Sequence, residues 1–377
     1  MNILMISPFY APNIGGVETH LTDLTGYLVN KNHHVSVLTY QPLTTKLSGK
    51  HIETRKNLYI KRVRWFGKNL FPRLEKYPIL EFIYLTPRLF LTSFLFMLKN
   101  RKRVDVIHAH GMNGAFIAKF ISKFFKKRAV VSLHAIYNFK ENSKTNFIYK
   151  WVLKSFDKIL TLSQASKKDL EKLGISVNSV QLYIYWINQK IFKKLDKNQC
   201  RKNLGLGPNF IVLFVGRLID IKGTDILIQV AKEVNKKITF IFIGTGPEEE
   251  KIRKESEKNK NIVFVGSVEN EKLAPYYNAA DILVIPSKYE EGFGRVILEA
   301  LSCGTPVVGS KIGGIPEAVT EEVGILVGPT SENFKKAILD LFENRKKLNW
   351  LAKNCRKYSE SKFGESNAKI IEKSYSS

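Results

Sequence analysis

Residues 282–317 read ILVIPSKYEEGFGRVILEALSCGTPVVGSKIGGIPE, in which short apolar runs alternate with glycine-rich turns and one amphipathic stretch. The runs Ile282–Ser287 and Pro306–Ser310 have the length and apolar content of buried strands. The stretch between them, beginning near Arg295, has the periodicity of a helix. Strand, helix and strand in this order predict a βαβ unit in a parallel sheet that is covered on both faces.

The same alternation extends over the whole chain and predicts an α/β protein with two doubly wound parallel sheets. The expected strands of the first half are Asn2–Ser7, His34–Tyr40, Tyr59–Trp65, Val104–His110, Ala129–His134 and Lys158–Ser163. Those of the second half are Phe210–Gly216, Ile238–Gly244, Ile262–Gly266, Ile282–Ser287, Pro306–Ser310 and Gly324–Gly328.

A chain of 377 residues exceeds what one hydrophobic core usually organises, so two domains are expected. The stretch Tyr185–Pro208 is polar, rich in lysine and closed by Gly and Pro, as expected of a linker. We therefore expect a first domain over 1–190 and a second over 191–359.

The three cysteines, Cys200, Cys303 and Cys355, are widely spaced and form no CxxC pair. This pattern excludes a disulfide framework and a zinc site, and indicates a reducing compartment. The first residues, MNILMISPFYAP, lack the basic and long apolar regions of a signal peptide, so no export is expected.

The positive charge is concentrated in the first half of the chain. Residues 1–200 hold 33 Lys and Arg against 11 Asp and Glu, whereas 201–377 hold 27 against 23. A one-sided positive field favours polyanions, either nucleic acid or an anionic membrane surface. A general lysine bias of the source proteome is the alternative, although such a bias would affect both halves alike.

The stretch Ile79–Leu98 is the most apolar part of the chain, although it contains Glu81 and Arg88. Its longest uncharged run, Leu89–Leu98, is too short to span a bilayer, so no membrane span is expected. Two interpretations stay open: a helix packed on the first sheet, or a helix at a membrane interface. The bases that flank the stretch favour the membrane; they are Arg73, Lys76, Lys99, Arg101, Lys102 and Arg103.

Ligands of open α/β sheets bind beyond the carboxyl ends of the strands, so the residues after each strand are the candidates. Gly15 and Gly16 follow the first strand and open a helix, where backbone N–H groups and the helix dipole suit an anion. A plain tight turn explains the two glycines equally well, and the dinucleotide fingerprint GxGxxG is not matched.

Two basic residues, Arg217 and Lys222, follow Gly216 at the end of the second domain's first strand. A guanidinium and an ammonium group in this place would neutralise the charge of a bound diphosphate and the further charge that it gains as a leaving group. A surface pair of basic residues is the alternative. The later strand end Gly244–Pro247 is expected to serve only as a sharp turn.

Glu291 lies in the glycine-rich loop of the opening stretch, and Glu299 lies eight residues later in the following helix. The loop residues Phe293, Gly294 and Arg295 come where the helix starts, so free N–H groups there could hold phosphate. One carboxylate can face a sugar ring while the other pairs with a ribose diol.

The stretch 286–317 resembles the donor-site signature of the family-four retaining glycosyltransferases, whose EX7E motif falls on Glu291 and Glu299. Other segments resemble the same family in the same order along the chain. They are PNIGGVETHLTDL, HVSVLTY, DVIHAHG, VVSLH, ILTLSQAS, GRL followed by KG, and IGTGPE.

The resemblance implies a GT-B fold, with two Rossmann-like domains facing across a cleft, the donor on the second and the acceptor on the first. It also implies that a helix at about 360–377 packs back on the first domain. On the second domain it implies that Arg217 and Lys222 hold the donor diphosphate, with Gly216 beside them. Glu299 would hold the ribose and Glu291 the transferred sugar.

The resemblance further implies that backbone N–H groups of Phe293, Gly294 and Arg295 lie beside sugar and phosphate. On the first domain, the Gly15–Gly16 loop would approach the diphosphate and the acceptor. His134 would contact the transferred sugar, although an isolated histidine at a strand end is more often structural.

Two departures from the family pattern are evident. Residues 185–188 read Tyr-Trp-Ile-Asn where many members have Asn-Gly-Val-Asp. Arg295 stands where an apolar residue is usual, which places an extra positive charge near the phosphates. This charge is expected either to alter the choice of donor or to change only the surface charge.

No Asp-x-Asp triplet occurs, so a metal clamp on the donor has no obvious ligands, and we expect neither metal nor cofactor. The basic residues and a helix N-terminus would stabilise the leaving diphosphate instead. We expect transfer with retention of anomeric configuration, in which the donor phosphate accepts the acceptor's proton.

The expected partners are a UDP- or GDP-sugar, a glycan or lipid-linked acceptor and an anionic membrane surface, without nucleic acid. The expected location is the cytoplasm, peripheral on the inner face of the plasma membrane.

Another GT-B enzyme, such as a glycogen synthase-like polymerase or an epimerase, is the nearest alternative function. A nucleic-acid-binding protein is a remote one, because no motif for it occurs, and an oxidoreductase would need the missing GxGxxG.

Overall fold

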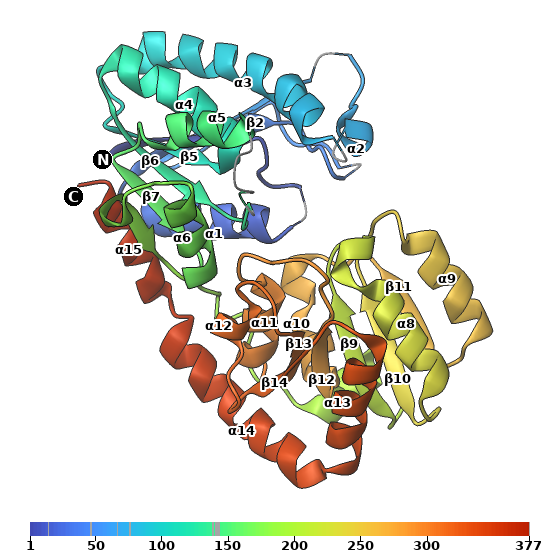
Figure 1. The fold of residues 1–377 in the computed structure, drawn as a ribbon. Helices are drawn as coiled ribbons and strands as arrows, with labels where there is room; N and C mark the ends of the chain where they lie inside the picture. The colour runs from blue at the N-terminus through green and yellow to red at the C-terminus, as the bar shows by residue number, and fades with distance from the viewer. Residues whose placement is uncertain are drawn as a thin grey trace. The chain divides into compact units, whose positions relative to one another are not determined.

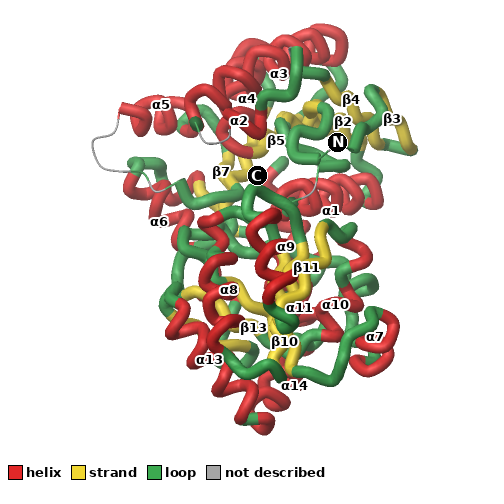
Figure 2. The backbone as a smooth tube through the Cα atoms, turned by 90° about the vertical axis from the view of Figure 1, so that its right-hand side faces the viewer, coloured by secondary structure: helices red, strands yellow, loops and turns green. Residues whose placement is uncertain are grey.

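Parallel strands buried on both faces form the centre of each half of the chain. A computed structural model describes residues 1–13, 15–45, 47–65, 67–74, 77–137, 139 and 144–376. They divide into two units, Met1–Ile184 with Asn367–Ser377, and Tyr185–Ser366. In each unit the helices, red in Figure 2, flank yellow strands. The expected α/β architecture with two parallel-sheet domains is confirmed.

The described residues of the first unit form an eight-stranded sheet in the order β3-β4-β2-β1-β5-β6-β7-β8. All neighbours pair in parallel except β3 and β4. Its strands are β1 (Asn2–Ile6), β2 (His34–Tyr40), β3 (Ile52–Arg55), β4 (Leu58–Val63), β5 (Val106–His110), β6 (Arg128–Leu133), β7 (Lys158–Thr161) and β8 (Val180–Leu182). The sequence did not predict β3, which is polar and mostly exposed, or β8, which has three residues.

The helices of the first unit lie on both faces of its sheet, with α3, α4 and α5 on one face and α1 and α15 on the other (Figure 1). Their bounds are α1 (Gly16–Asn30), α2 (Phe71–Leu74), α3 (Pro78–Asn100), α4 (Gly111–Phe125), α5 (Lys144–Leu153), α6 (Gln164–Lys172) and α15 (Ala368–Ser374). Every residue of the central strand β5 is buried, as expected for a strand covered on both sides.

The second unit has a parallel sheet in the order β11-β10-β9-β12-β13-β14, and all six of its strands were predicted. They are β9 (Phe210–Val215), β10 (Ile238–Ile243), β11 (Ile262–Gly266), β12 (Ile282–Ile285), β13 (Val307–Ser310) and β14 (Gly324–Val327). The helices are α7 (Lys197–Asn203), α8 (Thr224–Glu233), α9 (Glu249–Lys258), α10 (Ala274–Ala279), α11 (Arg295–Ser302), α12 (Ile315–Ala318), α13 (Ser331–Glu343) and α14 (Arg345–Lys362).

The change from the first unit to the second comes at Tyr185, before the expected boundary near residue 190. Hydrogen bonds to the second unit explain the difference. The N–H of Ile187 donates to the carbonyl of Phe363 at 3.2 Å, and the Arg295 guanidinium donates to the carbonyl of Trp186 at 3.3 Å. The segment expected to be a loose linker is therefore part of the second unit from its first residues.

The last residues return to the first unit from Asn367, later than the expected position near 360. The Tyr27 hydroxyl donates to the Glu372 carboxylate at 2.7 Å, and the Arg128 guanidinium donates to the carbonyl of Ser374 at 3.2 Å. The chain before this point still belongs to α14, which packs on α11 in the second unit.

Helix α3 has the apolar character that the sequence predicted, and it packs on the first sheet through Leu85, Leu89 and Met97. It has 23 residues, and its most apolar window has a mean hydropathy of 1.4 and is 28% buried. By length and composition alone the helix could cross a membrane, whereas the short uncharged run Leu89–Leu98 predicted no span. Lys76, one of the expected flanking bases, lies outside the described residues.

Candidate functional site

The glycine-rich loop after β12 is fixed by close backbone contacts. The N–H of Gly314 donates to the carbonyl of Glu291 at 2.8 Å. A Cβ at Gly314 would overlap the carbonyl oxygen of Gly292, so only glycine permits this approach. Helix α11 begins directly after Gly294, and the N–H of Ile297 in its first turn donates to the carbonyl of Gly294 at 2.9 Å. The amides before Ile297 are the ones that an α-helix itself leaves for other partners. The two glycine-rich segments of the opening motif thus hold each other and fix Glu291.

Lys222 and Glu291, both predicted to bind the donor, form an ion pair in the second unit. The Lys222 Nζ lies 2.9 Å from Glu291 Oε1, and the Ser287 hydroxyl donates to the same oxygen. The ammonium also lies 5.1 Å from the centre of the Tyr289 ring. Burial opposes the charge of Lys222, but the Glu291 carboxylate and Tyr289 outweigh it, so the pKa of Lys222 is raised.

The pair lies at the carboxyl edge of the second sheet because β9 and β12 are neighbouring parallel strands. Gly223, next to Lys222, has φ 71°, and a Cβ there would overlap the carbonyl of Pro286, which follows β12. Arg217 follows Gly216 at the end of β9, with an exposed side chain. The fold therefore brings the strand ends that carry Gly216, Arg217, Lys222 and Glu291 to one edge of the sheet.

Glu299 is buried within the second unit, and both of its oxygens accept hydrogen bonds. The Tyr277 hydroxyl donates to Oε2 at 2.7 Å, and the Asn270 amide donates to Oε1 at 2.9 Å. Burial, followed by the charge of Glu299, raises the pKa of Tyr277 well above its usual range. Sequence reasoning missed Tyr277 and Asn270, because nothing in their local sequence marks them as partners of Glu299.

Arg295 is not a surface charge, which corrects one of the two expectations for it. Its side chain is 4% exposed, and its Nε lies 3.5 Å from Glu299 Oε1. With the hydrogen bond to Trp186, it joins the start of the second unit to α11. Phe293 is also buried and its ring contacts Phe363, so only its backbone is available to a ligand.

The N-terminus of α1, where the sequence suggested an anion, already holds a carboxylate. Gly15 has extended backbone and precedes α1, while Glu18 in the first turn is 8% exposed. The Glu18 carboxylate lies so close to Gly15 that a Cβ on that glycine would overlap it. An acidic side chain in this position complements the helix dipole and disfavours a second anion.

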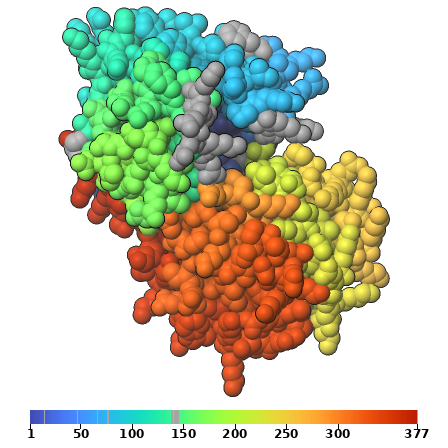
Figure 3. Space-filling view, in the orientation of Figure 1, coloured from blue at the N-terminus to red at the C-terminus, as the bar shows by residue number. Residues whose placement is uncertain are grey.

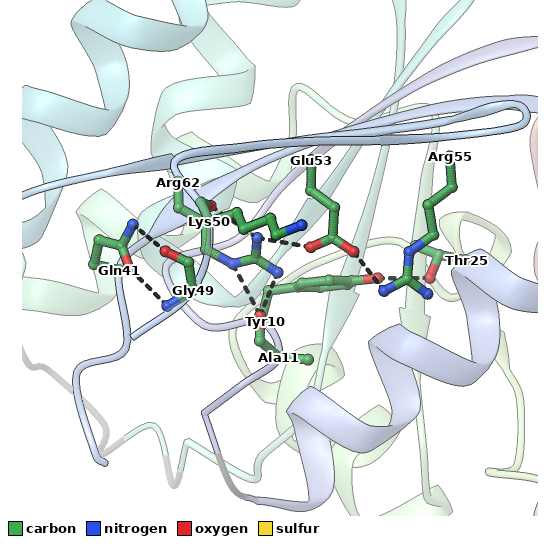
Figure 4. A network of polar contacts seen from close by, with 9 residues as sticks. All are labelled: Tyr10, Ala11, Thr25, Gln41, Gly49, Lys50, Glu53, Arg55 and Arg62. Atoms are coloured by element: carbon green, nitrogen blue, oxygen red, sulfur yellow. Dashed lines mark hydrogen bonds and ion pairs between the residues drawn. The ribbon is translucent and has the colours of Figure 1, made fainter. Parts of the chain in front are cut away.

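A polar network holds the loop that leads to Gly15 (Figure 4). Arg62 of β4 donates to the carbonyl of Ala11 through Nη2 at 2.8 Å and to Glu53 through Nη1 at 3.1 Å. Asn13 accepts from the backbone N–H of Leu43 at 2.7 Å. The loop after β1 is therefore tied to β4 and to the chain after β2, a connection that the sequence did not reveal.

Replacing Arg62 by alanine is expected to lower the free energy of unfolding by about 3 kcal/mol, because Ala11 and Glu53 lose a buried charged partner. Arg62 is 4% exposed, whereas Arg55, which pairs with the same Glu53, is 75% exposed. Arg55→Ala is the matched control and should cost less than about 1 kcal/mol. Urea unfolding of both variants measures the difference, and equal losses would contradict this account of the network.

His134 lies at the end of β6 in a cluster of aromatic side chains. Its Nε2 lies 3.2 Å from His110 Nδ1, and its Nδ1 lies 3.4 Å from the Tyr183 hydroxyl. Next to His110, His108 Nδ1 lies 2.8 Å from the Tyr375 hydroxyl of the C-terminal segment. His134 is therefore not isolated, and its ring is positioned by neighbours from β5 and from the chain after β8.

The histidines of this cluster are neutral at physiological pH. Burial lowers the pKa of His108 and of His134 to about 3 and holds that of His110 well below its usual value. A neutral imidazole can donate or accept a hydrogen bond but contributes no positive charge. One feature of the sequence indicates this cluster. His108 and His110 are two residues apart at the end of the buried strand β5, so their side chains point to the same side of the sheet.

Within the described part of the chain, no group of three or more His, Cys, Asp or Glu side chains is placed to hold a metal ion.

Two family models match the chain, one in each unit. Residues 14–182 match the model described as Glycosyltransferase Family 4, and residues 196–358 match the one described as Glycosyl transferases group 1. Among curated proteins, the GPI3 subunit of the Saccharomyces cerevisiae phosphatidylinositol N-acetylglucosaminyltransferase is 24% identical over 88% of this chain and 72% of its own. An uncharacterised 41.2 kDa protein from the cps region of Klebsiella pneumoniae is 31% identical over 72% of this chain and 79% of its own.

Solved structures share the fold over the whole chain. Sucrose-phosphate synthase from Thermosynechococcus elongatus has a TM-score of 0.84 at 23% identity, covering 99% of this chain and 98% of its own. HepE of Anabaena in complex with UDP-glucose has a TM-score of 0.79 at 21% identity, covering 99% of both chains. At these identities the likeness establishes the GT-B fold.

Proposed function

Because this chain belongs to the glycosyltransferases of group 1 and family 4, we propose that it transfers a sugar from a nucleoside diphosphate sugar to an acceptor hydroxyl. The observation that carries the proposal is the Lys222–Glu291 pair at the carboxyl edge of the second sheet, 2.9 Å apart. The pair combines a cation for phosphate with a carboxylate for sugar hydroxyls at the usual ligand edge of an α/β sheet. A solved structure of the same fold holds UDP-glucose.

On donor binding, we infer that Lys222 exchanges its carboxylate partner for the diphosphate, and that Glu291 then accepts hydrogen bonds from the sugar. Arg217, exposed at the neighbouring strand end, adds a second cation to the diphosphate. The amides of Phe293, Gly294 and Arg295 at the start of α11 complete the phosphate site. Glu299, held by Tyr277 and Asn270, binds the ribose with the oxygen lone pairs that remain.

The reaction retains the anomeric configuration. The bond from the anomeric carbon to the phosphate oxygen breaks, and the acceptor oxygen bonds to that carbon from the same face. The acceptor proton passes to an oxygen of the leaving phosphate. Lys222 and Arg217 stabilise the charge that grows on the diphosphate, so neither metal nor cofactor is needed.

On the first unit, we infer that the neutral ring of His134 contacts the transferred sugar, with its two nitrogens held by His110 and Tyr183. We infer that the loop at Gly15 and Gly16, which was expected to approach both the diphosphate and the acceptor, contacts the acceptor, because the Glu18 carboxylate already lies at the N-terminus of α1. In this proposal the first domain, expected at 1–190, binds the acceptor, and the second, expected at 191–359, binds the donor. In the structure the second unit begins at Tyr185 and ends at Ser366.

The acceptor is a glycan or a lipid-linked molecule, and the protein works in the cytoplasm at the inner face of the plasma membrane. The excess of positive charge in residues 1–200 supports an anionic membrane as partner, and nucleic acid has no recognition motif here. A relative with 24% identity is described as acting on phosphatidylinositol. The alternative function is that of another GT-B enzyme, such as a polymerase of the glycogen synthase kind or an epimerase. Analysis of the reaction product distinguishes it from the proposed glycosyltransferase.

A panel of UDP-glucose, UDP-N-acetylglucosamine, UDP-galactose and GDP-mannose tests the donor class and the role of metal together. One nucleotide sugar is expected to raise the melting temperature and to be hydrolysed slowly, with the same rate in excess chelator. Loss of hydrolysis in chelator that added Mg²⁺ or Mn²⁺ restores would contradict the metal-free mechanism. No response to any of the four would contradict the proposed donor class.

A further inference from the structure

We propose that the outer face of α3, α4 and α5 is a docking surface for an anionic lipid bilayer. We name this face the outer apolar face; it consists of the exposed apolar side chains of these three helices. The proposal rests on the proposed function in one respect, because it identifies the surface from which a lipid-linked acceptor would be taken.

Exposed apolar side chains gather on these three helices. They carry eleven of the twenty large hydrophobic side chains that are exposed in the described part of the chain, while the second unit carries three. The most exposed include Ile79 and Ile83 on α3, Phe124 on α4 and Phe147 on α5, with exposed fractions of 67%, 59%, 66% and 75%. In Figure 3 the cyan and blue-green surface of α3 and α4 lies along the rim of the first unit.

The outer apolar face is continuous from one helix to the next. The rings of Phe94 on α3 and Phe124 on α4 lie 5.3 Å apart, and those of Phe120 on α4 and Trp151 on α5 lie 5.8 Å apart. Helix α3 already covers the sheet through its opposite side, where Leu89 is fully buried. A helix that is apolar on both sides needs an apolar partner for each side, and the described residues of the chain cover only one side of α3.

The charges around this face identify the partner. The three helices are connections of a parallel sheet and run in the same direction, so their C-terminal ends meet at one edge. Exposed bases lie there in each case: Lys99 in the last turn of α3 and Arg101–Arg103 after it, Lys123 and Lys126 at the end of α4, and Lys154 after α5. Within the three helices the sequence has one acidic residue, Glu81.

An apolar face with a basic rim matches an acyl layer beneath anionic headgroups, where each Lys or Arg strengthens binding about fivefold. A second copy of the chain would bring the same positive charge against the rim, and an uncharged apolar partner would leave it unpaired. The charge therefore favours a bilayer over either protein partner.

The orientation of the helices suits a membrane-held acceptor. Helix α4 starts at Gly111, directly after His110 at the carboxyl edge of the first sheet, and α3 begins at the same edge because it leads back to the start of β5. A bilayer along the outer apolar face thus reaches the edge that carries His110 and His134, where the headgroup of a lipid-linked acceptor would be presented.

Flotation of the full-length protein with vesicles tests the proposal. We expect binding to phosphatidylcholine vesicles that contain phosphatidylglycerol, weak binding to phosphatidylcholine alone, and weaker binding as salt is raised. The double variant Leu95→Glu with Phe124→Glu is expected to bind the anionic vesicles at least about a hundredfold more weakly. The control Trp350→Glu, at an exposed residue of α14 in the second unit (51%), should bind as the wild type.

Both altered side chains are exposed, 50% for Leu95 and 66% for Phe124, so the fold should be retained, and circular dichroism checks it. Equal binding to both vesicle types, or unchanged binding of the double variant, would overturn the proposal. A dimer in ultracentrifugation that the double variant abolishes, without vesicle binding of the wild type, would show an interface between copies instead. Donor hydrolysis in solution is measured in parallel, so failure of the proposed function is distinguished from failure of docking.

Discussion

Replacing Lys222 by methionine is expected to lower kcat/KM for donor hydrolysis by about 10²–10³, the cost of removing one group that stabilises charge in the transition state. Methionine keeps the length of the side chain but removes the ammonium that now lies 2.9 Å from Glu291. The loss should appear in KM and in kcat, because the ammonium faces both the charge that the bound diphosphate already carries and the charge that it gains as the bond to the sugar breaks.

Lys288→Met is the matched control for this variant. Lys288 lies in the same loop as Glu291, but its ammonium pairs with Asp220 at 3.0 Å and Asp225 at 2.7 Å. Its kcat/KM should stay within about threefold of the wild type. Melting temperatures of both variants separate lost catalysis from lost fold, and a comparable loss in the two folded variants would contradict the role of Lys222.

Lowering the pH from 7.5 to 5 is expected to destabilise the first unit through its buried histidines. In the folded protein the pKa of His108 and of His134 is about 3, below the value near 6.5 of an unfolded chain. The unfolded state therefore binds more protons between these values, so stability is complete above pH 6.5 and declines as the pH falls toward 3. The loss at pH 5 amounts to about 2 kcal/mol for each of the two histidines.

Urea unfolding followed from pH 7.5 to 5 measures this dependence. His34→Gln, at an exposed histidine at the start of β2, is the control and should leave the pH dependence as in the wild type. His108→Gln should reduce it, because the substituted side chain does not titrate. A free energy of unfolding that is flat over this range would contradict the buried, neutral state of the cluster.

The sequence predicted the strands that are apolar and missed the two that are not. The polar strand β3 has no run of apolar residues, and β8 is too short to produce one. The expected boundary near residue 190 comes later than Tyr185, where the second unit begins. A polar, lysine-rich composition predicts a linker, whereas Ile187 is held by a backbone hydrogen bond to Phe363. Such bonds leave no trace in local composition.

The candidate site was predictable where it is contiguous and unpredictable where it depends on distant residues. The loop and helix that carry Glu291 and Glu299 form one stretch of sequence, with glycines whose packing requires them. Arg62, which holds the loop before Gly15, comes from a different strand. Nothing in its local sequence distinguishes this buried arginine from an exposed one. A surface charge was one of two expectations for Arg295, and the sequence could not decide between them because burial of a charged residue depends on partners that only the fold provides.

The most direct test of the central claim is a calorimetric titration of the wild type and Lys222→Met with the nucleotide sugar that the donor panel selects, in the presence of chelator. The account predicts one site per chain in the wild type and binding at least about tenfold weaker in the variant, as expected when one charged partner of a phosphate is removed. Equal affinity in the two proteins, or wild-type binding that appears only when metal is added, would contradict a donor site built on Lys222 and Glu291.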